Sequence, residues 1–354
     1  MTNNYILRKA TKDDIPAIAA VINASSMDTL GTTWAVTTEN GELRQGLWVE
    51  ESSEKVVVTT KAGQVVAYQH LYFEEPYITS EAGGFVHPNY RGQGIGTMLL
   101  DWAETRATEM LSQAPLGVKT VLAVSCFDTN KHTLSLLKKR GHTFVHEWPH
   151  LKMPLSTPPA LVDPEGITIR PLNFQTDWPA TIEVLIAAFR DHWGVIIDES
   201  ALEFPGSAQA SEPNEPSKAE TDTEAEENEE NYDPYSNTPG LCFVALDGDR
   251  IVGGCLCEEK NTEFKNTGRL GSLFIHPDYR RRGIGEVLSN YALDAYIKRG
   301  YTQVITDTDA ESFTGAIHLY QKLGMKVYRR QHTYEKTIRA GREVRALRVE
   351  DLAK

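Results

Sequence analysis

Cysteine is scarce in this 354-residue sequence, which contains four: Cys126, Cys242, Cys255 and Cys257. So few scattered thiols exclude a disulfide framework and indicate a reducing compartment. Cys255 and Cys257 lie two apart in a strand-like run and therefore share a face, but no second pair at zinc spacing accompanies them. We expect buried core cysteines and no metal site.

Long apolar runs are also missing. No stretch of about 18 apolar residues occurs, which argues against a membrane-spanning helix. Residues 1–5 lack a basic segment followed by an apolar one, so we expect no secretion signal and a cytoplasmic protein. The length is too great for one ordinary core and suits two domains.

Positive charge is in short supply as well. The formal net charge is −13, and residues 212–233 contribute −9 of it through ten acidic residues and one lysine. A nucleic-acid partner is disfavoured because it needs a basic surface. The acidic run is nearly free of apolar residues, so residues 205–236 are predicted to be a disordered, solvated insertion. A lure for a cationic substrate and a docking site for a basic protein partner are the alternatives.

What the sequence does contain is a repeat. Residues 85–96, Phe-Val-His-Pro-Asn-Tyr-Arg-Gly-Gln-Gly-Ile-Gly, recur at 274–285 as Phe-Ile-His-Pro-Asp-Tyr-Arg-Arg-Arg-Gly-Ile-Gly. An opening segment recurs too, since Asp14 and Asp177 each precede a proline by two residues. We call residues 1–154 copy one and residues 167–340 copy two. Residues 155–166 form a proline-bearing linker and residues 341–354 a tail, and the insertion belongs to copy two.

Both copies show the same order of predicted elements. An opening strand leads to a helix with proline in its first turn, and two strands follow around a glycine turn. Each copy continues with a strand that ends at His-Pro and a helix. A buried strand, a second helix that ends at a glycine and a closing strand follow. The predicted ranges are 5–9, 55–60, 65–73, 97–111, 120–126 and 131–139 in copy one, and 167–171, 241–246, 251–258, 286–299, 303–308 and 315–322 in copy two. This order predicts a mixed α/β fold with helices covering a central sheet.

The Arg-x-x-Gly-x-Gly loop between a strand and a helix has a chemical meaning. Glycines let the backbone approach a ligand closely, and the amides at the helix N-terminus favour an anion such as phosphate. A dinucleotide fingerprint would need a different spacing early in the unit, and a P-loop would need Gly-Lys-Ser/Thr. A helix start without a ligand is the remaining alternative, and the presence of two such loops disfavours it.

These residues resemble a known family. Residues 275–285 resemble motif A, and residues 315–325 resemble motif B, of the GCN5-related N-acetyltransferases, the GNAT superfamily. The doubled chain is similar to tandem, mycothiol synthase-like acetyltransferases. The resemblance implies two tandem GNAT acyl-CoA N-acyltransferase domains, with acetyl-CoA as acyl donor and an amine as acceptor.

The resemblance also implies which residues contact the donor. Motif A amides would hold the pyrophosphate, and the preceding strand would pair with pantetheine and supply an amide to the thioester carbonyl. In copy two these are Leu273, Phe274, Ile275, Arg280, Arg281, Arg282, Gly283, Ile284 and Gly285. In copy one they are Phe85, Val86, Arg91, Gly92, Gln93, Gly94, Ile95 and Gly96.

A catalytic acid is implied in one copy. Motif B of the family carries a tyrosine that protonates the departing thiolate, and here it is Tyr320. Leu137 stands at the matching place in copy one, whereas the family's asparagine is kept there as Asn130 and replaced by Phe313 in copy two. We therefore expect copy two to be catalytic and copy one to be non-catalytic. A coenzyme A-binding sensor or scaffold without turnover is the alternative.

The general base and the acceptor are not visible in the sequence. Glu258, Glu259 and Glu263 lie near the motif A strand, but we expect each to be a solvated strand-end charge. Acceptor contacts in the family come from regions that correspond to residues 187–194 and 328–334. Their aromatics are Phe189, Trp193, Tyr328 and Tyr334, which suit a pocket wall or a core equally.

Overall fold

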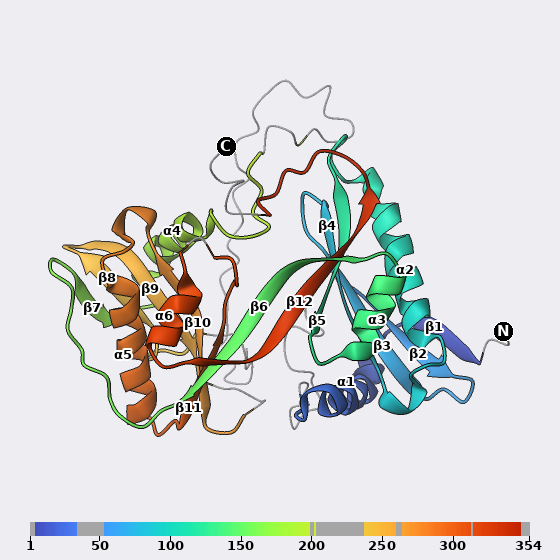
Figure 1. Ribbon diagram of the computed structural model, residues 1–354, viewed down its shortest axis with the longest axis horizontal. Coiled ribbons are helices and arrows are strands. Elements are labelled where there is room, and N and C mark those ends of the chain that lie inside the picture. Colours follow the sequence, from blue (N-terminus) through green and yellow to red (C-terminus); the bar gives the residue numbers. More distant parts are fainter. Residues whose placement is uncertain are drawn as a thin grey trace.

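A computed structural model describes residues 4–33, 53–198, 202, 237–259, 264–312 and 314–347. The described strands join into one mixed, twelve-stranded sheet in the order β1-β2-β3-β4-β5-β12-β6-β11-β10-β9-β8-β7 (Figure 1). The predicted acidic insertion, residues 205–236, lies outside the described residues. The mixed α/β class predicted from the sequence is confirmed.

Copy one has the predicted elements with small shifts at their ends. Its strands are β1 (Tyr5–Lys9), β2 (Ser53–Thr60), β3 (Val65–Phe73), β4 (Thr79–Val86), β5 (Thr120–Phe127) and β6 (Thr143–Pro154). Its α-helices are α1 (Ile15–Leu30), α2 (Ile95–Glu109) and α3 (Lys131–Lys139). Alternation along β2 explains the layering: Val57 packs with residues of α1, whereas Val56 and Val58 pack with residues of α2. The two helices thus cover opposite faces of the sheet.

Copy two repeats this arrangement. Its strands are β7 (Thr168–Pro171), β8 (Phe243–Asp247), β9 (Arg250–Glu258), β10 (Thr267–Ile275), β11 (Gln303–Asp307) and β12 (Lys326–Arg339). Its α-helices are α4 (Trp178–Phe189), α5 (Ile284–Lys298) and α6 (Ala316–Lys322). Strand β9 is buried along almost its whole length, as expected for a central strand covered on both faces. Cys242, Cys255 and Cys257 lie in the core of copy two, and Cys126 lies in the core of copy one. All four are free and buried, as predicted.

The opening segment of each copy is held by one ion pair. The Arg8 guanidinium donates to both carboxylate oxygens of Asp14, at 2.7 and 2.6 Å. In copy two, Arg170 donates to Asp177 at 2.6 and 3.0 Å. Each arginine lies on the first strand and each aspartate precedes the first α-helix, so the pair fixes strand to helix. The repeated aspartate therefore marks a repeated structural contact.

The closing strands are exchanged between the copies. We expected each closing strand to complete its own sheet, and this is wrong. Strand β12 pairs with β5 of copy one through Gln331–Arg339, and β6 pairs with β11 of copy two through His150–Pro154. The two strands also pair with each other, and they cross diagonally between the halves in Figure 1. The local pattern of a strand does not identify its partner, and here the partner belongs to the other copy.

Residues 341–347, the described part of the predicted tail, are packed against both copies. Arg342 exchanges backbone hydrogen bonds with Gly117 and Lys119 of copy one, at 2.8 Å each. Ala346 does the same with Gly194 and Val195 after α4, at 2.7 and 2.8 Å. Arg345 is buried and pairs with Glu335 at 2.8 Å. This segment therefore ties the two copies together. No helix in the described part of the chain is long and apolar enough to cross a bilayer.

Candidate active site

The two glycine loops have nearly the same backbone. Gly94 and Gly283 cap α2 and α5 in the left-handed conformation, with φ of +85° and +80°. Two residues earlier, copy one has Gly92 at φ +75°, whereas copy two has Arg281 at φ +64°. A left-handed arginine is strained because its Cβ crowds the backbone. The first amides of each helix have no intrahelical partner, so both loops can hold an anion.

The first arginine of each loop is tied to the opening helix of its copy. Arg91 pairs with Asp28 and donates to Ser25 Oγ at 3.1 Å. Arg280 pairs with Asp191 and donates to the Ala188 carbonyl at 2.9 Å. These contacts fix the loop against α1 or α4. Direct contact of the two arginines with the donor stays a prediction.

The strand before each loop diverges from its parallel neighbour. Pairing of β10 with β11 ends at Arg269–Ile305, and β10 is irregular between Leu270 and Ser272. Leu273, Phe274 and Ile275 therefore lack β11 as a partner. In copy one, pairing of β4 with β5 ends at Ala82–Val124, ahead of Phe85 and Val86. An unpaired strand edge can pair with an extended ligand.

A cavity of about 1230 Å³ connects the loop and the strand of copy two. Of the predicted donor residues, its walls include Leu273, Phe274, Ile275, Arg280, Arg281, Gly283 and Gly285. Arg282 and Ile284 are not in its walls: Arg282 lies over the ring of Tyr279, and Ile284 is a core residue. Trp148 of β6 completes the wall from copy one.

Tyr320 lines this cavity from α6. Its side chain is 4% exposed, and burial raises the pKa of the phenol above its usual value. The phenol is therefore protonated at neutral pH and has a proton to give. In copy one, Leu137 is buried in the core, and a hydrocarbon side chain has none.

One sequence expectation about the carboxylates is wrong. Glu258 is buried and lines the cavity, where Arg269 pairs with it and with Asp307, the latter at 2.8 Å. It is not a solvated strand-end charge, because the last residue of a central strand is still covered here by its neighbours. Glu259 is half-buried and pairs with Arg299 at 3.4 Å. Glu263 lies outside the described residues.

A second buried pair was not predicted from the sequence. His146 Nε2 lies 2.9 Å from Asp309 Oδ1, and the two side chains are 1% and 4% exposed. Asp309 lines the cavity of copy two, whereas His146 belongs to β6. The His146 ring stacks on Trp193, with 4.6 Å between ring centroids. A signal was present, because His146, Trp148 and His150 alternate along one strand and so share one face.

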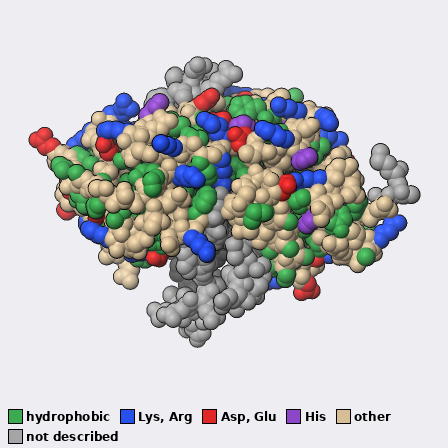
Figure 2. Space-filling view, turned by 60° about the horizontal axis from the view of Figure 1, so that its bottom comes forward, with side chains coloured by type: hydrophobic (Ala, Val, Ile, Leu, Met, Phe, Trp, Pro, Cys, Tyr) green, Lys and Arg blue, Asp and Glu red, His purple; other side chains and the backbone are tan. Residues whose placement is uncertain are grey.

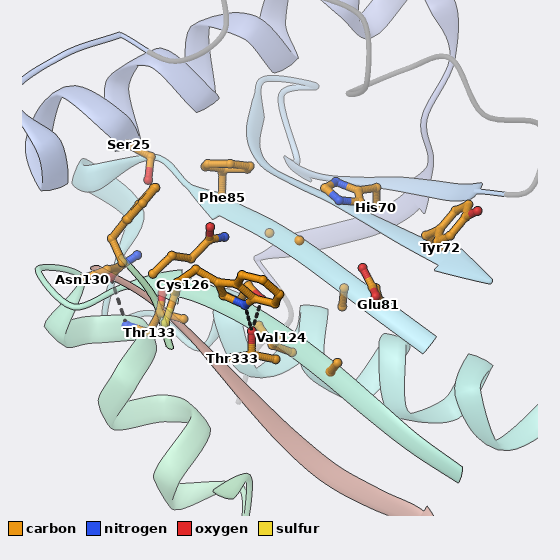
Figure 3. A pocket seen from close by; sticks show the side chains of 18 of the residues that line it. Ser25, His70, Tyr72, Glu81, Phe85, Val124, Cys126, Asn130, Thr133 and Thr333 are labelled. Atoms are coloured by element: carbon orange, nitrogen blue, oxygen red, sulfur yellow. Dashed lines mark hydrogen bonds between the residues drawn. The ribbon is translucent and has the colours of Figure 1, made fainter. Parts of the chain in front are cut away.

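Copy one has two adjoining cavities. One of about 460 Å³ follows its glycine loop and includes Val86, Arg91, Gly92, Gly94, Ile95 and Gly96, but not Gln93. The other, of about 660 Å³, includes Phe85, and Figure 3 shows His70, Tyr72 and Glu81 toward one end and Asn130 and Thr133 toward the other. Ser25, Asn130 and Thr133 line both cavities. Burial lowers the pKa of His70 to about 4, so its ring is neutral at pH 7.

The aromatics of the expected acceptor regions do not share one pocket. Phe189 lines the copy two cavity, whereas Trp193 lines the larger cavity of copy one. Tyr334 lies in the core of copy one, because β12 has crossed to that sheet. Strand exchange thus places residues of each copy in the surroundings of the other.

No group of metal-ligating side chains occurs among the described residues. On the face drawn in Figure 2, Lys and Arg side chains are spread over both halves with Asp and Glu between them.

Comparison with known proteins agrees with the repeat. Residues 24–142 and 207–325 each match the acetyltransferase (GNAT) family, together more than half of the chain. The mycothiol acetyltransferase of Saccharopolyspora erythraea is 25% identical over 275 residues, which cover 77% of this chain and 82% of the relative. That of Geodermatophilus obscurus is 23% identical over 325 residues, which cover 90% and 94%.

Two solved structures share the whole architecture. A GCN5-related N-acetyltransferase from Sphaerobacter thermophilus matches with a TM-score of 0.69 and 25% identity, covering 97% of this chain and 98% of the other. A tandem GNAT protein from the clavulanic acid biosynthesis pathway matches with a TM-score of 0.64 and 14% identity, covering 96% and 100%. With two family matches and two full-length structural neighbours, the chain belongs to the GNAT acetyltransferase family as a tandem, two-domain member.

Proposed function

We propose that this protein is an N-acetyltransferase that moves an acetyl group from acetyl-CoA to a primary amine of a small molecule or peptide. Copy two is the catalytic unit, and Tyr320 is its general acid. One observation carries the proposal: Tyr320, the left-handed glycine loop and the unpaired edge of β10 line the same cavity. Copy one has the loop and the edge but has Leu137 in place of the tyrosine.

The donor site is proposed from the shape of the backbone. The amides of Gly283, Ile284 and Gly285 would hold the pyrophosphate at the start of α5, and Arg281 would add charge. The free edge of β10 at Leu273–Ile275 would pair with the pantetheine amides. The side chains of Phe274 and Ile284 point into the core, so these two residues contribute only backbone atoms.

The proposed reaction needs three events in the copy two cavity. A neutral amine nitrogen forms the C–N bond, while an amide of β10 stabilises the oxyanion. The C–S bond breaks as Tyr320 gives its proton to the sulfur, so that the thiol leaves rather than the thiolate. The nitrogen loses its proton to water, and Tyr320 regains one from water, which balances the transfer.

Copy one is proposed to bind the donor without turnover or to serve as a scaffold. The adjoining cavities around Asn130 suit a bound ligand, but the position of the acid is a leucine. The names of the relatives make a mycothiol-type amine the first acceptor to test. The alternative function, a coenzyme A sensor without catalysis, would require that copy two also lack turnover.

Thiol release from acetyl-CoA with a panel of amines tests this proposal. We expect Tyr320→Phe to lower kcat by about 10²-fold or more, because proton transfer to the leaving group is lost. Tyr291→Phe is the control, because Tyr291 belongs to copy two and its hydroxyl donates to Asp163 of the linker. Thiol release that is undiminished in Tyr320→Phe would refute the acid role. Donor binding without turnover by the wild type would favour the sensor.

A further inference from the structure

The acidic side chains of the copy two cavity are not equivalent. Among the described residues, five carboxylates line it, and four of them pair with an arginine or a lysine. These pairs are Asp191–Arg280, Glu258–Arg269, Asp307–Arg269 and Glu286–Lys322. Permanent cations therefore offset most of the negative charge in this wall.

Asp309 is the exception. Its Oδ1 lies 2.9 Å from His146 Nε2 and accepts a hydrogen bond from the Glu311 amide at 2.7 Å. Its side-chain partner is thus a histidine and not an arginine or a lysine. The next basic group is His192: burial lowers its pKa, although Asp309 and Asp191 act in the opposite direction. Among the described residues, Asp309 is therefore the carboxylate of this wall that no arginine or lysine offsets.

The position of Asp309 is fixed by strand exchange. The residue lies two positions after the end of β11, beyond the point where pairing with β10 stops. The Thr308 amide donates to the Pro149 carbonyl and the Ala310 amide to the Glu147 carbonyl, both at 3.1 Å. Asp309 is thus held between two backbone hydrogen bonds to β6, a strand of copy one, and by a side chain of that same strand.

We propose that Asp309 docks the ammonium group of the acceptor and that His146, contributed by the other copy, is its positioning residue. The inference rests on the proposed function and adds the side chain that recognises the acceptor, a primary amine that arrives protonated. Docking changes no bond, and the ammonium gives one proton to water before its nitrogen attacks. At the matching position copy one has a thiol instead of a carboxylate, because the alignment that sets Leu137 opposite Tyr320 sets Cys126 opposite Asp309.

Paired probes that differ only in charge test the docking. Calorimetry with the full chain would compare glucosamine with glucose, and tyramine with tyrosol. We expect the wild type to prefer each ammonium probe over its hydroxyl counterpart. Asp309→Asn should weaken the ammonium probes by about tenfold to a hundredfold and change the hydroxyl probes by less than about twofold. Cys126→Ser, the matching position of copy one, should change neither.

The role of His146 has its own readout. His146→Phe removes the ring nitrogen that lies 2.9 Å from Asp309 Oδ1 and should reduce the ammonium preference, whereas His146→Gln, which keeps a polar side chain, should restore most of it. An equal loss of both probe types would mean a merely structural role and would overturn the assignment of His146. These two variants also decide the matter if Asp309→Asn does not fold.

The docking and the proposed function fail in different ways. If the wild type selects ammonium through Asp309 but releases no thiol with any amine, docking stands and acetyl transfer is wrong. If thiol is released but a folded Asp309→Asn binds the ammonium probes as tightly as the wild type, docking is wrong. A wild type that shows no preference for either ammonium probe would overturn it as well.

Discussion

At the scale of single residues, the loops of the two copies differ most at Arg281. Its backbone has the left-handed conformation that Gly92 adopts without strain in copy one. A non-glycine residue in this region carries a conformational cost of about 1–2 kcal/mol. We interpret the strained arginine as a residue that lowers the stability of the protein but places a cation beside the proposed pyrophosphate site.

Exchanging the two residues tests this interpretation. Arg281→Gly should raise the free energy of unfolding by up to about 1 kcal/mol, because glycine relieves the strain and its own chain entropy offsets part of the gain. The same variant should weaken acetyl-CoA binding to copy two by roughly threefold to tenfold. Gly92→Arg is the matched control and should destabilise the protein. Denaturant unfolding and calorimetry measure the two effects, and an Arg281→Gly variant with lower stability would contradict the interpretation.

Residue identity predicted some sites and missed others. Tyr320 and the glycines could be named as candidates because local motifs carry them. The proposed docking carboxylate could not be named from the sequence, because Asp309 is distinguished by its contact with His146, which is 163 residues away. Glu258 was misjudged for a related reason: its burial depends on Arg269, which approaches from the neighbouring strand.

At the scale of elements, each copy begins with the same strand-to-helix ion pair. The Arg8 guanidinium, against a smaller opposing effect of burial, lowers the pKa of Asp14 from 3.8 to about 2, and Arg170 has the same effect on Asp177. The folded protein thus binds fewer protons at these sites than the unfolded chain. The stabilisation is complete above about pH 4 and is lost as the pH falls toward 2.

The lowered pKa of the two aspartates predicts how the stability of their asparagine variants depends on pH. Asp14→Asn and Asp177→Asn should each lower the thermal midpoint at pH 7, and the difference from the wild type should shrink below pH 4. Asp13→Asn, an exposed neighbour, should have little effect at either pH. Thermal unfolding followed by circular dichroism gives the midpoints. A deficit that is as large at pH 3 as at pH 7 would show that the ion pairs do not stabilise the fold in this way.

At the scale of the whole molecule, the copies share one sheet. The helices, the strands and their order followed from patterns within each copy, so a chain of two similar units was predictable. The exchange of β6 and β12 was not, because the residues of a strand do not by themselves identify the strand that it pairs with. In the structure β12 inserts between β5 and β6, and β6 inserts between β12 and β11.

The exchange predicts that neither half is complete alone. Residues 1–154 lack β12, which pairs with β5, and residues 155–354 lack β6, which pairs with β11. Each fragment should therefore aggregate or remain partly unfolded, because long sheet edges are exposed. Co-expression of the two fragments should give a 1:1 complex with the far-ultraviolet spectrum of the intact chain. Two fragments that are each monomeric and cooperatively folded would contradict this prediction.

Trp148 lines the larger cavity of copy one and the cavity of copy two. After a duplication, one unit is ordinarily free to drift while the other keeps the ancestral task. Because the indole is shared, any replacement of Trp148 changes the walls of both cavities at once. The two copies therefore cannot vary independently at this position.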